Sequence, residues 1–188
     1  IGAVREAAEA AAEVEQALVA AMVWSAHHAE ITLAEGRALA TKNCFGSGAY
    51  RSATCSDAPM AEGRHYAEFT VVQRSPNNHS LQGSIAVGVV PAADAGRSEE
   101  PAVHMWDADG NHYQGGSGSR WKLVDGDYNS LHAQYTQGDV LGLLLDLDAG
   151  TLTAYKNGSV LGVMVPNAKV KELGAGPFCW GVNLKTKG

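Results

Sequence analysis

Residues Gly138 to Gly162 read Gly-Asp-Val-Leu-Gly-Leu-Leu-Leu-Asp-Leu-Asp-Ala-Gly-Thr-Leu-Thr-Ala-Tyr-Lys-Asn-Gly-Ser-Val-Leu-Gly, and they predict three β-strands joined by two tight turns. The run from Val140 to Leu147 is short and almost wholly apolar, as expected of a strand buried in a sandwich. Thr151 to Tyr155 alternates between two faces, which is the pattern of a half-buried strand. Asp148-Ala149-Gly150 supplies a glycine for the first reversal, and Asn157-Gly158 predicts a hairpin turn. The stretch is therefore a predicted β-meander.

The motifs of this meander resemble, in order and spacing, the core of the SPRY domain family, β-sandwich interaction modules also found at the C-termini of butyrophilins. The matching pieces are Gly-Asp-Val-x-Gly, Leu-Asp-Leu-Asp, Gly-Thr-Leu, Tyr-Lys-Asn-Gly and Leu-Gly. Three other stretches resemble family segments in the same order: Gly63 to Val71, Gly83 to Val89, and Gly174 to Leu184. Ala67 departs from the family, which more usually has Trp or Phe at that position. The resemblance implies a mainly β protein with an antiparallel sandwich of the concanavalin-like jelly-roll type.

The first part of the chain differs in composition from the rest. Residues 3 to 25 are rich in alanine, contain neither glycine nor proline, and carry acidic residues in their early turns, which predicts an α-helix. Its heptad positions form a narrow stripe of mostly small residues that either the sandwich of the same chain or another chain must cover. In the second case the helix attaches the domain to a larger assembly through Val4, Val14, Leu18 and Met22. We therefore expect a helix over residues 1–28 and a sandwich domain over residues 29–188.

Composition narrows the classes of partner. The 188 residues are 45% hydrophobic and include 22 glycines, which suits one folded, turn-rich β domain with an extension. The formal net charge of −6, without a run of Lys or Arg, argues against nucleic acid or an anionic membrane as partner. The apolar stretch from Ala17 to Ala26 is too short to span a bilayer. Cys44, Cys55 and Cys179 form no Cys-x-x-Cys pair, which favours a reducing intracellular compartment, cytoplasmic or nuclear.

The sequence contains no complete motif for catalysis or metal binding. The segment from Asp107 to Asn111 superficially resembles a calcium loop, but His112 stands at the sixth position and Gly118 at the twelfth. The carboxylate pair Asp146 and Asp148 suits glycan chemistry in principle, although a turn capped by Asp148 explains it more simply. We therefore expect no enzyme activity, no cofactor and no metal, and we keep a glycan-binding or glycan-cleaving sandwich as the alternative.

The resemblance also implies where a partner binds. In the family, the ligand surface is a shallow cleft between the loop before the Tyr-x-Glu strand, the middle hairpin and the C-terminal segment. The corresponding residues here are Tyr50, Arg51, Ser52, Trp106 and Leu184. Arg51 is either a ligand for a peptide carboxylate or carbonyl, or simply a solvated strand residue. Trp106 begins a glycine-rich stretch to Ser119 that reads as a surface loop, so we expect it to be at least half exposed and to act as an apolar anchor. The predicted function is a non-catalytic protein–protein interaction module, serving as an adaptor or an accessory subunit.

Overall fold

The computed structural model describes residues 22–42, 50–72, 85–96, 104–107, 111–114, 119–122, 134–165 and 176–185. One sheet contains β1 (Ala26–His27), β4 (Tyr50–Thr54), β6 (Ile85–Pro91), β7 (His104–Asp107), β8 (Asn111–Gln114), β9 (Ser119–Lys122) and β13 (Phe178–Lys185). The second contains β5 (Arg64–Thr70), β10 (Val140–Asp146), β11 (Thr151–Lys156) and β12 (Ser159–Val165). A hairpin of β2 (Ile31–Ala34) and β3 (Leu39–Lys42) encloses the 3-10 turn η1 (Glu35–Arg37), and a second such turn, η2 (Ala92–Asp94), follows β6.

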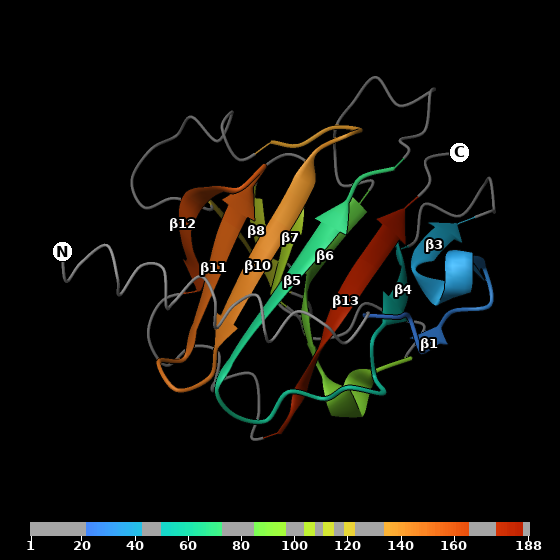
Figure 1. The fold of residues 1–188 in the computed structure, drawn as a ribbon, viewed down its shortest axis with the longest axis horizontal. Helices are drawn as coiled ribbons and strands as arrows, with labels where there is room; N and C mark the ends of the chain where they lie inside the picture. Colours follow the sequence, from blue (N-terminus) through green and yellow to red (C-terminus); the bar gives the residue numbers. More distant parts are fainter. Residues whose placement is uncertain are drawn as a thin grey trace, which may run out of the picture.

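The strand order is β1-β4-β13-β6-β7-β8-β9 in the first sheet and β12-β11-β10-β5 in the second. Every described pairing is antiparallel, and the two sheets lie face to face (Figure 1). The predicted antiparallel β-sandwich is therefore confirmed.

The meander forms the centre of the four-stranded sheet, as predicted. Leu141, Leu143 and Leu145 on β10 are wholly buried, because alternate residues of a strand point to the same face. On β11 the residues opposite Leu145 and Leu143 are Leu152 and Ala154, which are also wholly buried. These side chains meet Val87, Val89, Trp106, Trp180 and Val182 of the larger sheet in one core. Each fully buried aliphatic side chain contributes about 1.5–3 kcal/mol of burial free energy.

The turn between β11 and β12 is held from several sides. Asn157 and Gly158 have φ values of 50° and 78°, the two positive values that a type I′ turn requires. The Asn157 side chain accepts a hydrogen bond from the Val140 N–H (2.9 Å) and donates one to Asp139 (2.8 Å). Burial alone would raise the pKa of Asp139, but the hydrogen bonds from Asn157 and from the Thr136 N–H, together with Lys156, hold that pKa below its usual value. The turn and the start of β10 are thus one hydrogen-bonded unit.

The predicted N-terminal helix is wrong where the structure describes it. Residues 1–21, with Val4, Val14 and Leu18, lie outside the described residues, but Met22 to Ser25 are not helical and β1 pairs with β4. Trp24 is 7% exposed and its ring stacks on Phe69 at 6.1 Å. Burying this indole in the sandwich outweighs the helix propensity of the preceding alanines. The β domain therefore begins by Met22, which itself packs against the core, and not at residue 29.

Where the structure describes it, the glycine-rich stretch after Trp106 is strand and not surface loop. It contains the end of β7, all of β8 and the first residue of β9, which extend the larger sheet. Trp106 has no exposed surface, and its ring meets Tyr135 edge to face at 5.2 Å. The Tyr135 hydroxyl donates to the carbonyl oxygens of Ile85 (2.8 Å) and Trp106 (3.0 Å), tying β6 to β7. The expected exposure of Trp106 is therefore wrong, because strand alternation directs this side chain into the core.

The Gly158→Val substitution should lower the free energy of unfolding by about 1–3 kcal/mol, because a β-branched residue is strained at positive φ. Thermal melting measures the loss. Gly176→Val is the matched control: a new Cβ meets nothing within 4 Å at either position, but only Gly158 has a positive φ. Equal melting temperatures for the two variants would contradict the strained-turn explanation.

The Trp24→Ala substitution should lower the free energy of unfolding by about 3–5 kcal/mol, as for a large aromatic removed from a core. Denaturant unfolding of the full chain measures it, and Trp24→Phe should lose much less because it keeps a ring against Phe69. An unchanged unfolding midpoint for Trp24→Ala would show that the segment from Met22 is not part of the domain core.

Candidate binding surface

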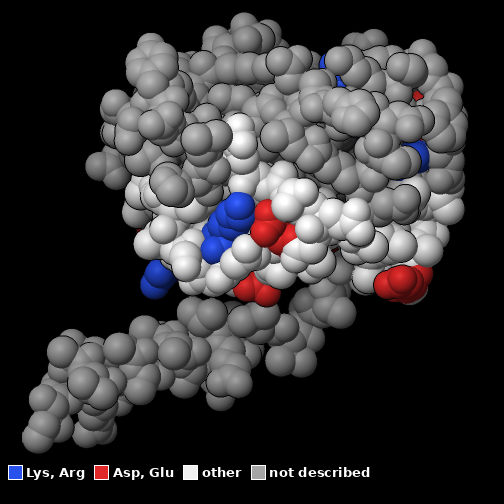
Figure 2. All heavy atoms as spheres, turned by 90° about the horizontal axis from the view of Figure 1, so that it is seen from above, with Lys and Arg blue, Asp and Glu red and all other residues white. Residues whose placement is uncertain are grey.

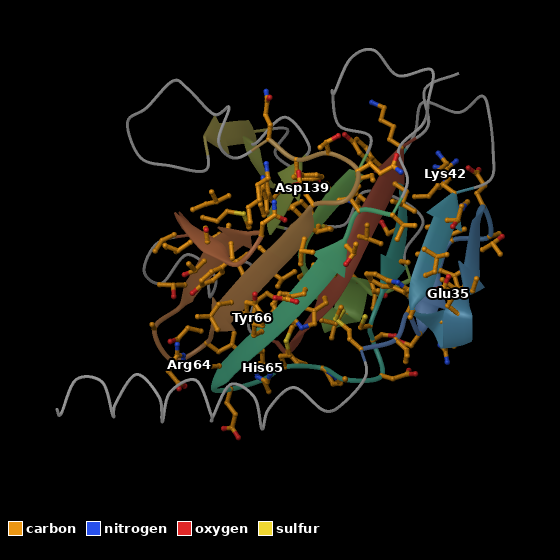
Figure 3. All side chains as sticks on the ribbon, turned by 45° about the horizontal axis from the view of Figure 1, so that its top comes forward. Glu35, Lys42, Arg64, His65, Tyr66 and Asp139 are labelled. Carbon is orange, nitrogen blue, oxygen red and sulfur yellow. The ribbon has the colours of Figure 1, made fainter. Side chains whose placement is uncertain are left out.

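Charged and aromatic side chains gather at the end of the sandwich where β3 and β13 end and β4 begins. We call this surface the β4–β13 rim and define it by five residues: Glu30, Lys42, Tyr50, Arg51 and Lys185. The β4–β13 register places Lys185 opposite Tyr50 and Leu184 opposite Arg51. Figure 3 shows Lys42 at one end of the β2–β3 hairpin and Glu35 at the other, so the rim lies away from the hairpin tip.

Glu30 is the ionic centre of the rim. Its carboxylate lies 2.9 Å from Arg51 Nη2 and 3.8 Å from Lys42 Nζ. The hydrogen bond from Arg51, helped by the charges of Arg51 and Lys42, holds the pKa of Glu30 below its usual value against the opposing effect of desolvation. The Lys42 side chain is only 2% exposed, whereas those of Arg51 and Glu30 are 19% and 24% exposed. The Arg51–Glu30 pair is therefore partly exposed to solvent.

Tyr50 and Lys185 form a second contact on the rim. The Lys185 ammonium lies over the Tyr50 ring, 4.9 Å from its centroid, which is the geometry of a cation–π interaction. Two cations of the rim, Arg51 and Lys42, lie beside the Glu30 carboxylate, and Lys185 adds a third over Tyr50, in a chain whose net charge is −6. Seen from above in Figure 2, a small group of basic side chains lies next to a small group of acidic ones among the described residues that the view leaves uncovered.

The sequence-predicted binding residues do not share one surface. Ala53 faces the core with no exposed surface, so strand alternation places Arg51 on the core side of β4 and Tyr50 and Ser52 on the other. Ser52 is 3% exposed, and its hydroxyl donates to Asn183 Oδ1 at 2.6 Å, in a buried contact that joins β4 to β13. Ser52 therefore has a structural role.

The buried Trp106 lies between the sheets, so a role as an exposed anchor is wrong. Leu184 is partly buried against the core beside Arg51. Of the predicted set, Tyr50 and Arg51 belong to the rim, on opposite faces of β4, and Leu184 lies beside Arg51 on the core face. Sequence reasoning missed Glu30, Lys42 and Lys185, although each lies at or beside the end of a predicted strand.

Asp146 stabilises the turn that follows β10. Its Oδ1 accepts a hydrogen bond from the Ala149 N–H at 2.7 Å, and its Oδ2 lies 3.5 Å from Arg64 Nε. The predicted turn is confirmed, but Asp146 and not Asp148 caps it, because the Asp146 side chain reaches forward over the reversal to the Ala149 N–H. Among the residues that the structure describes, no three His, Cys, Asp or Glu side chains are grouped to hold a metal ion. Within the same residues, no helix has the length and apolar character needed to cross a membrane.

Comparison with known proteins identifies the architecture. The sequence model of the SPRY domain matches residues 64–187. The crystal structure of the SPRY domain of human HERC1 is similar at 21% identity and a TM-score of 0.54, covering 76% of this chain and 79% of that one. The TRIM65 PSpry domain is similar at 17% identity and a TM-score of 0.52, covering 88% of this chain and 86% of that one. No curated protein matches the chain by sequence comparison.

The Arg51→Met substitution should raise the pKa of Glu30 toward its usual value, because it removes the principal hydrogen bond to the carboxylate. A ¹³C carboxyl NMR titration follows Glu30 directly, with Arg64→Met as the control that leaves it unchanged. Since the folded-state pKa is lowered, the pair stabilises the fold above the usual glutamate pKa of about 4.3. That contribution is lost as the pH falls through the lowered value, and an identical Glu30 titration in both variants would contradict the pairing.

Proposed function

This chain belongs to the SPRY domain family, whose members are protein–protein interaction modules, and we propose that it binds an extended segment of a partner protein at the β4–β13 rim. The observation that carries the proposal is the Arg51–Glu30 pair, which is open to solvent while its supporting strands are part of a rigid sheet. Binding residues at the ends of a rigid scaffold are the common arrangement for recognition.

The chemistry of the rim favours a partner segment that carries acidic side chains. Arg51 donates from Nη2 to Glu30 and from Nη1 to the Tyr50 carbonyl, and its side chain is partly exposed. Each Nη carries two N–H groups, so the guanidinium keeps donor capacity for a carbonyl or carboxylate of the partner. Lys185 adds an ammonium above Tyr50, and Leu184 offers a neighbouring apolar contact. Tyr, Arg and apolar side chains together are the residue types that contribute most to binding energy at interfaces.

The proposed module is an adaptor or an accessory subunit without catalysis of its own. Asp146, the strongest candidate for acid/base chemistry, is engaged by Ala149 and Arg64. The cysteines support the proposal of a reducing compartment: Cys55 and Cys179 are buried free thiols. Burial raises the pKa of Cys55 to about 12 and that of Cys179 to about 11, so both stay protonated and poorly nucleophilic.

An array of short extended peptides tests the rim. Acidic peptides that bind the wild-type chain should bind Arg51→Ala and Lys185→Ala at least about tenfold more weakly, and the loss should shrink in high salt. Arg64→Ala is the matched control, since Arg64 is 63% exposed and lies on the other sheet. Binding that survives both rim substitutions, or that Arg64→Ala abolishes, would place the ligand elsewhere.

A further inference from the structure

The four-stranded sheet carries apolar side chains on the face that points away from the core. Leu143 and Leu145 of β10 are buried in the core, so strand alternation places Val140, Gly142 and Leu144 on the opposite, outer face. A central strand with one solvated face alternates apolar and polar residues, whereas β10 is apolar on both faces until its last residue. The pattern of β10 therefore indicates a strand that is covered on both faces.

The neighbouring strands extend this apolar surface across the sheet. The register places Leu144 opposite Tyr66 of β5 on one side and opposite Thr153 of β11 on the other. On β12, Val163 lies opposite Thr153 and is 51% exposed, and Val160 is 64% exposed. Residues that lie opposite each other share a face of the sheet. We call this surface the outer strip and define it by five residues: Tyr66, Leu144, Tyr155, Val160 and Val163.

The centre of the outer strip is a pair of tyrosines packed over a glycine. Tyr66 and Tyr155 come from the strands on either side of β10 and meet edge to face, with ring centroids 5.8 Å apart. Tyr66 lies over Gly142, where an added Cβ would collide with the tyrosine hydroxyl. That hydroxyl donates to Glu68 at 2.9 Å. The two rings are therefore held in place by contacts within the sheet itself.

The described part of the chain begins beside this sheet. Met22 packs against the core, and Trp24 stacks on Phe69 of β5, which is an edge strand of the four-stranded sheet. Residues 1–21 therefore start next to the strand that carries Tyr66. A tethered segment has an effective concentration on the order of millimolar for a neighbouring face, so a separate partner would have to compete with it.

Residues 3–21 have the sequence pattern of a helix with one apolar side. Glu6, Glu9 and Glu13 fall together on one side of such a helix, at about 100° per residue. At about 1.5 Å per residue this helix is about 28 Å long, and the seven-residue strand β10 is about 23 Å long. The helix is therefore long enough to cover the sheet. Its apolar side is narrow and is made of mostly small residues: Val4, Ala7, Ala11, Val14, Leu18 and Ala21.

We propose that residues 3–21 form a helix that packs on the outer strip of the same chain. Each surface covers the other, because the helix is marginal in water with its apolar side bare and the strip leaves Val160 and Val163 in solvent. The acidic side of the helix then faces water. The apolar side of the helix is thus covered by its own sandwich and not by another chain. This contact is independent of the proposed function, because the outer strip contains none of the rim residues.

Methyl NMR on the full chain tests the contact directly. Nuclear Overhauser effects should connect the methyl groups of Val14 or Leu18 with those of Val160 or Val163. A mixture of labelled and unlabelled chains then separates contacts within one chain from contacts between two copies, and the effects should arise within one chain only. A spectrum without these effects, or with effects only between chains, would overturn the proposal.

Hydrogen exchange gives a second readout on residues 3–21. Their amides should be protected in the wild-type chain, and Val163→Lys and Leu18→Lys should each lower that protection at least about tenfold, because each removes a buried aliphatic side chain. Thr41→Lys is the control on the sandwich, since Thr41 is an exposed strand residue of the β2–β3 hairpin, at the side of the molecule opposite β12 (Figure 1). Gln16→Lys is the control on the helix, since Gln16 falls on its acidic side. Both controls should keep the protection.

Two exchange results would also overturn the proposal: unprotected amides in the wild-type chain, or protection that survives both Val163→Lys and Leu18→Lys. Circular dichroism melting establishes that the sandwich of each variant is folded before its exchange is interpreted. If Val163→Lys does not fold, Val160→Lys replaces it, because Val160 is more exposed and lies on the same face.

Discussion

The burial of the β10 leucines between the two sheets is the constraint on which the rest of the structure depends. Leu141, Leu143 and Leu145 have no exposed surface, and they are covered only if the larger sheet presents its own apolar face across the gap. The large aromatics of β7 and β13 meet that need, with Trp180 reaching Phe69 edge to face at 6.2 Å. Removing either sheet would return these leucines to water, so neither sheet is stable without the other.

The same need to cover apolar side chains explains how the edges of the sandwich are built. Two stacked sheets bury each other's central strands, but the apolar side chains of the outer strands need a further element to cover them. At the β5 edge that element is the segment around Trp24, which stacks on Phe69 while Arg37 and Ala38 of the hairpin hold its backbone and indole. Three consecutive positive φ values over Glu35, Gly36 and Arg37 bring those carbonyl groups into position, with strain at the two residues that are not glycine. At β12 no described element does the same, and two valines are left in solvent.

The local features were predictable from the sequence, and the non-local ones were not. In the meander, alternating apolar residues predict the strands and Asn-Gly predicts the turn between them. Both patterns lie within the segment whose structure they determine, so the prediction needed no distant residue. Trp24 was misassigned because the alanines before it favour a helix, whereas its partner Phe69 is far away in the chain. Trp106 was misassigned because nearby glycines suggested a loop, although Tyr135 and the β6–β7 pairing bury it. For the rim, proximity of Arg51 to Glu30 follows from tertiary packing, and no local pattern reveals it.

The charge pair at the rim governs the kind of affinity that the proposed binding mode allows. In that mode, an incoming carboxylate must compete with Glu30 for Arg51 in a partly solvated site, where water and salt weaken each charge pair. A single rim therefore suits a modest and salt-sensitive affinity.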